Sequence, residues 1–163
     1  MTAPHHTSTS SSRQRHWLPL AIAIACAIGN GSELAHAEYG QSDLERSIAA
    51  GRLDSWYNLI EHGRQLDESQ KLQQVNRFIN RALSYASDQQ VWQSTDYWAT
   101  PSEALSRGQG DCEDYAIAKF FGLTQMGIPS ERLRLTYVKD LKHNQAPMVL
   151  ASSAPGASHP HLL

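Results

Sequence analysis

The chain has 163 residues, and its 14 lysines and arginines against 16 aspartates and glutamates give a formal net charge of -2. This length fits one domain, and the near-neutral balance offers no electrostatic attraction to nucleic acid, so nucleic acid is not an expected partner. Hydrophobic residues make up 40% of the chain, which is sufficient for one modest core.

Residues 1–37 have the three parts of a secretory signal peptide. Two arginines precede an almost wholly apolar run at residues 17–28, and Ala35-His36-Ala37 has the small-x-small form of a cleavage site. The apolar run is too short for a membrane span, which needs about 20 residues. We therefore predict export, cleavage near Ala37 and no transmembrane segment in the mature chain. A membrane anchor is the alternative.

The chain has two cysteines, Cys26 and Cys112. Cleavage near Ala37 removes the first, unless Cys26 is itself a lipoprotein site. Cys112 is then alone in an oxidising compartment and has no partner for an internal disulfide. A lone thiol of this kind is either a buried bystander or a reactive group.

Two antiparallel helices are predicted at the start of the mature chain. Residues 42–45 (Ser-Asp-Leu-Glu) have the form of a capping box, and the apolar spacing after them predicts a helix that ends at Gly63. A second helix is predicted from near Asp67 to about Leu83. Residues 88–106 are rich in aromatics and contain a proline, so we predict a loop with short helical turns there.

A third helix is predicted to follow a glycine-flanked turn, Gly108-Gln109-Gly110. Asp111 is its natural N-cap, and Asp114 stands at the position that reaches back to the cap. Gly127, with a proline two residues later, ends it.

Alternating residues at 133–138 predict a strand, and residues 148–151 predict a second one. Residues 152–163 show no periodicity, and we expect an unstructured tail. The predicted organisation is therefore a leader, a folded domain at 38–151 and a tail, with an α+β fold in which helices precede an antiparallel sheet.

The residues around Cys112 have opposing effects on its thiol. A cysteine in the first turn of a helix is favoured as the nucleophilic thiolate by free backbone N–H groups and by the helix dipole. The carboxylates of Asp111, Glu113 and Asp114 raise the thiol pKa instead. Either these acids merely cap the helix and face water, or they hold a hard cation such as calcium, which prefers several oxygen ligands.

Three stretches resemble the bacterial transglutaminase-like cysteine proteinases, whose best-known members are the LapG-type periplasmic proteases. The similarity extends from about Leu53 to Ala151. Its motifs are Asp96-Tyr-Trp-Ala-Thr-Pro101, Gly108-Gln-Gly-Asp-Cys-Glu-Asp-Tyr-Ala-Ile-Ala-Lys119 and Leu133-Arg-Leu-Thr-Tyr-Val-Lys139.

The resemblance implies a papain-like or transglutaminase-like core with a Cys-His-Asp triad. It implies that Cys112 is the nucleophile, with a nearby backbone N–H for the oxyanion, and that Asp111 and Glu113, with Asp114 as a further candidate, bind calcium. It also implies a periplasmic protease that cleaves large surface adhesins to control biofilm attachment. The implied partner is an inner-membrane receptor that responds to cyclic di-GMP.

The chain departs from the family pattern at the catalytic base. The family's histidine lies in a segment that Asn144-Gln-Ala-Pro-Met-Val-Leu150 matches at every other position, and Pro147 stands in its place. Proline has no proton to accept or donate, so the base is missing. Proline also cannot donate a ladder hydrogen bond, which weakens the strand. The stand-ins are His143, in an expected loop, and His159 and His161, in the expected tail.

No segment matches the triad aspartate, so we expect a truncated or degenerate member with an incomplete sheet. Three hypotheses follow from this. The first is a cysteine peptidase with impaired catalysis, the second a non-catalytic homologue that competes for the receptor or the adhesin, and the third a product that folds poorly and has no function.

Overall fold

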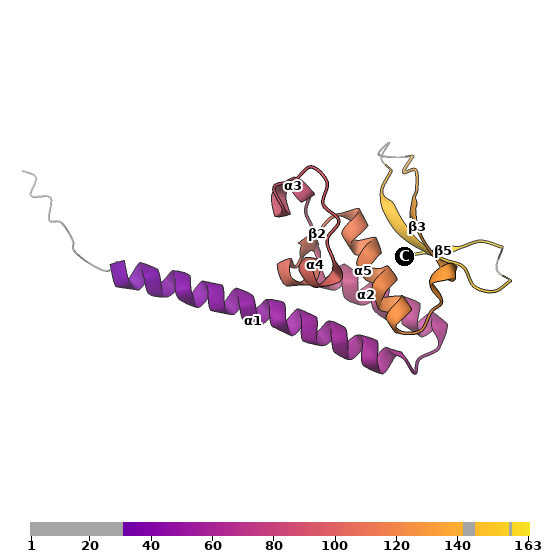
Figure 1. The fold of residues 1–163 in the computed structure, drawn as a ribbon, viewed down its shortest axis with the longest axis horizontal. Coiled ribbons are helices and arrows are strands. Elements are labelled where there is room, and N and C mark those ends of the chain that lie inside the picture. The colour runs from indigo at the N-terminus through magenta and orange to yellow at the C-terminus, as the bar shows by residue number, and fades with distance from the viewer. Residues whose placement is uncertain (1–30, 142–145, 157) are drawn as a thin grey trace, which may run out of the picture.

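The computed structural model describes residues 31–141, 146–156 and 158–163, with side chains from residue 42 onward. Figure 1 shows α1 as one long helix whose N-terminal half extends beyond the other elements. The elements, in chain order, are α1 (Gly31–Gly63), α2 (Glu68–Ala82), β1 (Ser84–Tyr85), α3 (Asp88–Val91), α4 (Pro101–Arg107), β2 (Gln109–Gly110), α5 (Cys112–Gln125), a 3-10 turn (Ser130–Arg132), β3 (Leu133–Tyr137), β4 (Met148–Ser152) and β5 (His161–Leu162).

The predicted leader lies mostly outside the described residues. Residues 31–37 enter the structure as backbone of α1, and residues 1–30 are not described, so the signal peptide stays a prediction. Within the described ranges, no helix is both long enough and apolar enough to cross a membrane.

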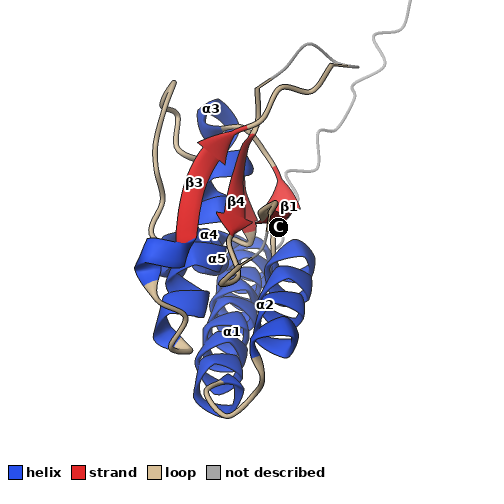
Figure 2. Cartoon of the chain, turned by 90° about the vertical axis from the view of Figure 1, so that its right-hand side faces the viewer, coloured by secondary structure: helices blue, strands red, loops and turns tan. Residues whose placement is uncertain are grey.

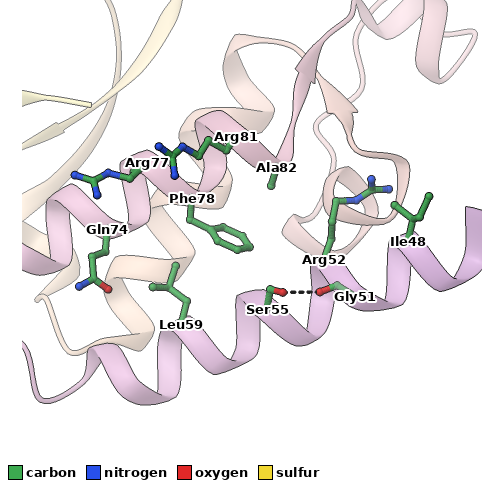
Figure 3. Close-up of a pocket in the computed structure, with 10 residues that line it drawn as sticks. All are labelled: Ile48, Gly51, Arg52, Ser55, Leu59, Gln74, Arg77, Phe78, Arg81 and Ala82. Atoms are coloured by element: carbon green, nitrogen blue, oxygen red, sulfur yellow. Dashed lines mark hydrogen bonds between the residues drawn. The ribbon is translucent and has the colours of Figure 1, made fainter.

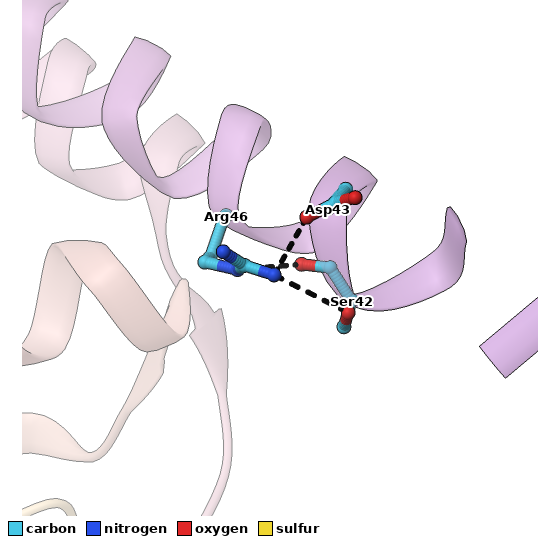
Figure 4. A network of polar contacts seen from close by, with 3 residues as sticks. All are labelled: Ser42, Asp43 and Arg46. Atoms are coloured by element: carbon cyan, nitrogen blue, oxygen red, sulfur yellow. Dashed lines mark hydrogen bonds and ion pairs between the residues drawn. The ribbon is translucent and has the colours of Figure 1, made fainter. Parts of the chain in front are cut away.

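The predicted start of the first helix is wrong. α1 begins at Gly31, so the capping-box motif at residues 42–45 lies inside a continuous helix. Arg46 bonds to the carbonyl oxygen of Ser42 at 3.3 Å and to a carboxylate oxygen of Asp43 at 2.6 Å, as contacts along one helix (Figure 4). Residues 31–41 are mostly good helix formers, and helix propensity therefore carries α1 through the motif. The predicted end at Gly63 is confirmed.

The second predicted helix is confirmed as α2. Asp67 caps it by accepting a hydrogen bond from the backbone N–H of Gln70 at 2.8 Å. The ring of Phe78 stacks on Trp56 of α1 with 5.6 Å between centroids, which packs the two helices against each other. The predicted loop with helical turns is also confirmed, since the short helices α3 and α4 lie within residues 88–107.

α5 lies between the helices and the sheet. Figure 2 shows β3 and β4 on one side of α5, with α1 and α2 below. The sheet is antiparallel with strand order β3-β4-β5, and Leu135 pairs with Leu150 across β3 and β4. The α+β fold class is confirmed. The fully buried core side chains include Val75, Ile79, Leu105, Leu123, Met126 and Leu150.

The expected unstructured tail contains a strand. β4 runs to Ser152, and β5 pairs with it through Ala151 opposite Leu162. The backbone N–H of Leu163 also donates to the carbonyl of Leu150 at 2.9 Å. Sequence periodicity missed β5 because a two-residue strand has no period, and what holds it is the need of β4 for backbone hydrogen-bond partners.

Candidate active site and cation site

Cys112 is the first residue of α5, and two glycines shape the turn that leads to it. Gly108 ends α4 with a φ of 69°, in the left-handed region that glycine enters without strain. A Cβ on Gly110 would lie 2.8 Å from the Cβ of Asp114, so this position needs glycine for close packing. β2 then pairs with β1 in parallel, which fixes the direction in which the chain enters α5.

The thiol of Cys112 is half-buried and lies in an acidic environment. Its sulfur donates a hydrogen bond to a carboxylate oxygen of Glu113 at 3.0 Å. Burial raises the pKa of the Cys112 thiol, and the bond to Glu113 raises it further, whereas an interaction with the backbone N–H of Met148 lowers it. Burial and the neighbouring acids therefore keep the proton on the thiol at neutral pH.

The start of β4 faces this thiol. Met148, whose N–H interacts with the sulfur, follows Pro147 directly. Pro147 lies at the end of the ladder, opposite Val138, and its carbonyl accepts from the backbone N–H of Val138 at 3.0 Å. Proline has no N–H to return the reciprocal bond to the Val138 carbonyl, so the ladder is one bond weaker at this end, as the sequence predicts. The structure thus brings position 147 to Cys112, and the residue there supplies no base.

The histidines considered as stand-ins do not fill this gap among the described residues. His161 lies in β5, in a hollow that it lines with Glu68 and Leu72. His159 is exposed in the segment before β5, and His143 lies outside the described residues. No histidine in the described ranges hydrogen-bonds to Cys112.

A cluster of carboxylates lies beside Cys112, and we call it the acidic cluster. The cluster contains three sets of residues, and within each set the ligand atoms lie within 4.8 Å of one another. The sets are Asp88, Asp111 and Asp114; Asp88, Asp96 and Glu113; and Asp111, Cys112 and Glu113. Of the three predicted metal ligands, Asp111 converges with Glu113 in one set and with Asp114 in another, and no set among the described residues holds all three; Asp88 and Asp96 are further members.

Backbone amides hold two of these carboxylates in place. The buried Asp114 accepts from the N–H of Ala99 at 2.9 Å and from the N–H of Asp111 at 3.3 Å. The buried Asp88 accepts from the N–H of Tyr97 at 2.5 Å. Asp114 thus joins the cap of α5 to the loop before α4, and Asp88 anchors the same loop from α3.

The acidic cluster has the properties of a cation site. One oxygen each of Asp88 and Asp111 is buried without a hydrogen-bond partner, which is costly for a carboxylate. Burial raises the pKa of Asp111 to about 7, and the hydrogen bond and charge of Glu113 contribute to this shift. Converging carboxylate oxygens are the ligands that calcium prefers, so the residues present fit that ion.

Sequence reasoning missed Asp88. It lies 23 positions before Asp111 in a four-residue helix, and only the tertiary fold brings it to the cluster. The sequence could have pointed to Asp96 as a member of the cluster, because Asp96 begins the first of the three motifs in the resemblance.

Comparison with known proteins agrees with this geometry. The family described as bacterial transglutaminase-like cysteine proteinase BTLCP matches residues 55–156. The structure of Legionella pneumophila LapG, EGTA-treated, is 39% identical with a TM-score of 0.64, and the match covers 74% of this chain and 66% of that one. The calcium-bound LapG structure is 38% identical, with a TM-score of 0.64 and coverage of 74% and 68%.

This chain thus spans about two thirds of the length of the LapG structures that it matches. No curated protein sequence matches it significantly. The family match covers more than half of the chain, and its α+β fold is the transglutaminase-like fold of LapG. The chain belongs to the family of bacterial transglutaminase-like cysteine proteinases.

Proposed function

We propose that this protein is an exported, periplasmic relative of the adhesin-cleaving cysteine proteases, with a calcium site and a thiol but without the catalytic base. Its substrate class is a large surface adhesin, and its upstream partner is an inner-membrane receptor that responds to cyclic di-GMP. Membership of the protease family and the predicted signal peptide support this assignment.

The observation that carries the proposal is the position of Pro147 against Cys112. The neighbouring Met148 N–H interacts with the sulfur, so the backbone at position 147 lies next to the thiol. A cysteine protease needs a base there to take the thiol proton and return it to the leaving amine. With proline in that position and Glu113 holding the proton on Cys112, the thiol stays in its weakly nucleophilic form.

The acidic cluster is proposed to hold calcium. Asp88, Asp111 and Glu113 would supply oxygens, with Asp96 and Asp114 beside them. The bound ion would neutralise the crowded carboxylates next to the thiol. The calcium-bound state of the LapG structure, together with the two unpartnered buried oxygens, supports this assignment.

The test is cleavage of an adhesin N-terminal fragment by the purified protein in calcium and in EGTA. We expect no cleavage by the wild-type chain above the level of Cys112→Ala. Robust cleavage by the wild type that Cys112→Ala abolishes would overturn the claim of inactivity.

A second readout isolates the base. Pro147→His should raise the rate of Cys112 alkylation by iodoacetamide near neutral pH, because an imidazole beside the thiol stabilises the thiolate. Cys112→Ala is the matched blank. If Pro147→His folds and leaves the alkylation rate unchanged, position 147 does not face the thiol as proposed.

A binding role without catalysis is the second candidate function. Trp98 is 53% exposed and borders a pocket of about 310 Å³ with Ile117, Phe121 and Leu135. Exposed aromatics beside an apolar pocket anchor protein interfaces, so this face suits competition for the receptor or the adhesin. A pull-down with the receptor's periplasmic domain tests it, and loss of capture in Trp98→Ala is the expected result. Absence of wild-type binding at micromolar concentration rules it out for that receptor.

A further inference from the structure

A groove lies between α1 and α2, on a different part of the molecule from the acidic cluster. It has a volume of about 570 Å³, and its apolar lining includes Ile48 and Leu59 from α1 and Phe78 and Ala82 from α2. Figure 3 shows Phe78 and Ala82 pointing from α2 toward α1, with Leu59 pointing back. We call this feature the α1–α2 groove. An apolar hollow of this size on a folded surface is a candidate binding site.

Two arginines on α2 make the groove selective for charge. Arg77 and Arg81 line it, and neither has a hydrogen-bond or ion-pair partner in the part of the chain that the structure describes. Arg52 differs from them, because its guanidinium donates to the carbonyls of Leu105 and Ser106 at 2.6 and 2.9 Å. A partner with carboxylates beside apolar side chains would therefore complement this lining.

The chain's own undescribed segments do not have this chemistry. Residues 1–30, 142–145 and 157 contain no aspartate or glutamate. They offer apolar, uncharged polar or basic side chains, and the basic ones are repelled by Arg77 and Arg81. A second molecule can supply the carboxylates that these segments lack.

The N-terminal half of α1 has the required chemistry. Leu44 and Ile48 lie one turn apart and are 61% and 48% exposed. Glu45, next to Leu44, has no ion-pair or hydrogen-bond partner within the described residues. This part of α1 extends beyond the body of the molecule, where another copy can reach it (Figure 1).

The spacing along α1 is self-complementary. Leu44 lies seven residues before Gly51, and Leu59 lies seven residues after Arg52. Two antiparallel copies of α1 centred there place Leu44 of each copy on Leu59 of the other, which is the reciprocal pairing that a two-fold axis requires. A Cβ on Gly51 would meet nothing within 4 Å, so the centre of this pairing is open.

We propose that the α1–α2 groove is covered by a second copy of this chain, with the two α1 helices antiparallel. Leu44 and Ile48 of one copy insert beside Leu59 and Phe78 of the other, and Glu45 faces Arg77. The interface forms a two-fold symmetric dimer and leaves the acidic cluster of each copy free.

Sedimentation velocity on the full chain, purified in the form that the expressing cell produces, tests the proposal over low to high micromolar concentrations. We expect a concentration-dependent dimer. Ile48→Glu should raise the dimer dissociation constant at least about tenfold, because it places a charge in each half of the apolar interface. Arg77→Glu and Glu45→Arg should each weaken the dimer, and the double variant Glu45→Arg/Arg77→Glu should restore it.

Tyr57→Glu is the matched control, since Tyr57 is 60% exposed on the same helix and does not line the groove. It should leave the dissociation constant unchanged. Circular dichroism confirms that each variant folds. A wild type that stays monomeric throughout the range overturns the proposal. So does a dimer that Ile48→Glu and Arg77→Glu leave intact, which would place the contact elsewhere.

Discussion

The site has two halves. One is the acidic cluster with Cys112 at the start of α5, and the other is the start of β4. The two halves differ in the chemical groups that they carry. The α5 half keeps its cap, its glycine turn, its thiol and its converging carboxylates. The β4 half places the backbone N–H of Met148 against the sulfur, and the residue before it, Pro147, has no side-chain proton to accept or donate. Backbone placement and side-chain chemistry are therefore separable, because β4 reaches the thiol with a residue that cannot act as a base.

Asp114→Ala tests the α5 half and has the largest expected effect. It leaves the buried N–H groups of Ala99 and Asp111 without their acceptor. We expect the free energy of unfolding to fall by about 2 to 5 kcal/mol, measured by urea denaturation in EDTA. Asp96→Ala, at an exposed carboxylate of the same cluster, is the control and should change it by less than about 0.5 kcal/mol. Equal effects of the two variants would mean that Asp114 does not hold the site together.

Calcium and pH should act together on the same cluster. Because the folded-state pKa of Asp111 is raised to about 7 from an ordinary 3.8, the folded protein binds a proton that the unfolded chain releases between these values. The calcium-free protein should therefore lose stability as pH rises from about 4 to about 7.

Added calcium competes with that proton and should stabilise the protein more at pH 8 than at pH 5. At about 100 times its dissociation constant, the gain above the pKa of Asp111 is about 2.7 kcal/mol. Thermal unfolding in EDTA and in calcium, at both pH values, measures this. Magnesium, which needs a stricter geometry, is the control ion. A calcium effect that is equal at the two pH values would exclude proton competition.

The parts of the site that follow one another in the chain were predictable from the sequence. Asp111 as the N-cap and Asp114 reaching back to it follow from local spacing. The end of α1 at Gly63 and the start of α2 after its cap, Asp67, also follow from local spacing. These features depend on backbone groups within one or two helical turns, which a sequence pattern records.

The parts that depend on tertiary contacts were not predictable. Asp88 reaches the acidic cluster only because the loop after α3 folds back onto α5. β5 exists because β4 has a free edge, and its own two residues carry no pattern. The start of α1 was misplaced because a capping motif inside a helix has the same sequence as one at its start.

Lys119→Met tests whether the buried amine of Lys119 on α5 stabilises the fold or costs stability. Lys119 is 5% exposed, and its amine lies 6.0 Å from the ring centre of Tyr115. Burial lowers the pKa of Lys119 to about 8 from 10.5, so the wild type should gain stability as pH rises between these values. Methionine removes the charge, and we expect it to stabilise the protein by about 1 to 2 kcal/mol at pH 7.

The same variant should abolish the gain in stability between pH 8 and pH 10.5. Urea denaturation across that range, with Lys71→Met as a control on α2, measures both effects. If Lys119→Met destabilises the protein at pH 7, the amine has a role that its burial does not reveal.

Arg132→Met tests the polar contacts that join the end of β4 to α2, and it has the smallest expected effect. Arg132 forms a two-pronged ion pair with Glu68 of α2, one prong at 2.8 Å, and donates to the carbonyl of Ser153 at 2.8 Å. Both side chains are partly exposed, so we expect the free energy of unfolding, measured by urea denaturation, to fall by about 1 kcal/mol.

Arg134→Met, at an exposed neighbour, is the control and should change the free energy of unfolding by less than about 0.5 kcal/mol. Because the apolar contacts of Leu133 and Leu150 remain, the sheet should stay packed on α5. If Arg132→Met costs more than Asp114→Ala, the sheet rather than the acidic cluster organises the fold, and the relation between the two halves is reversed.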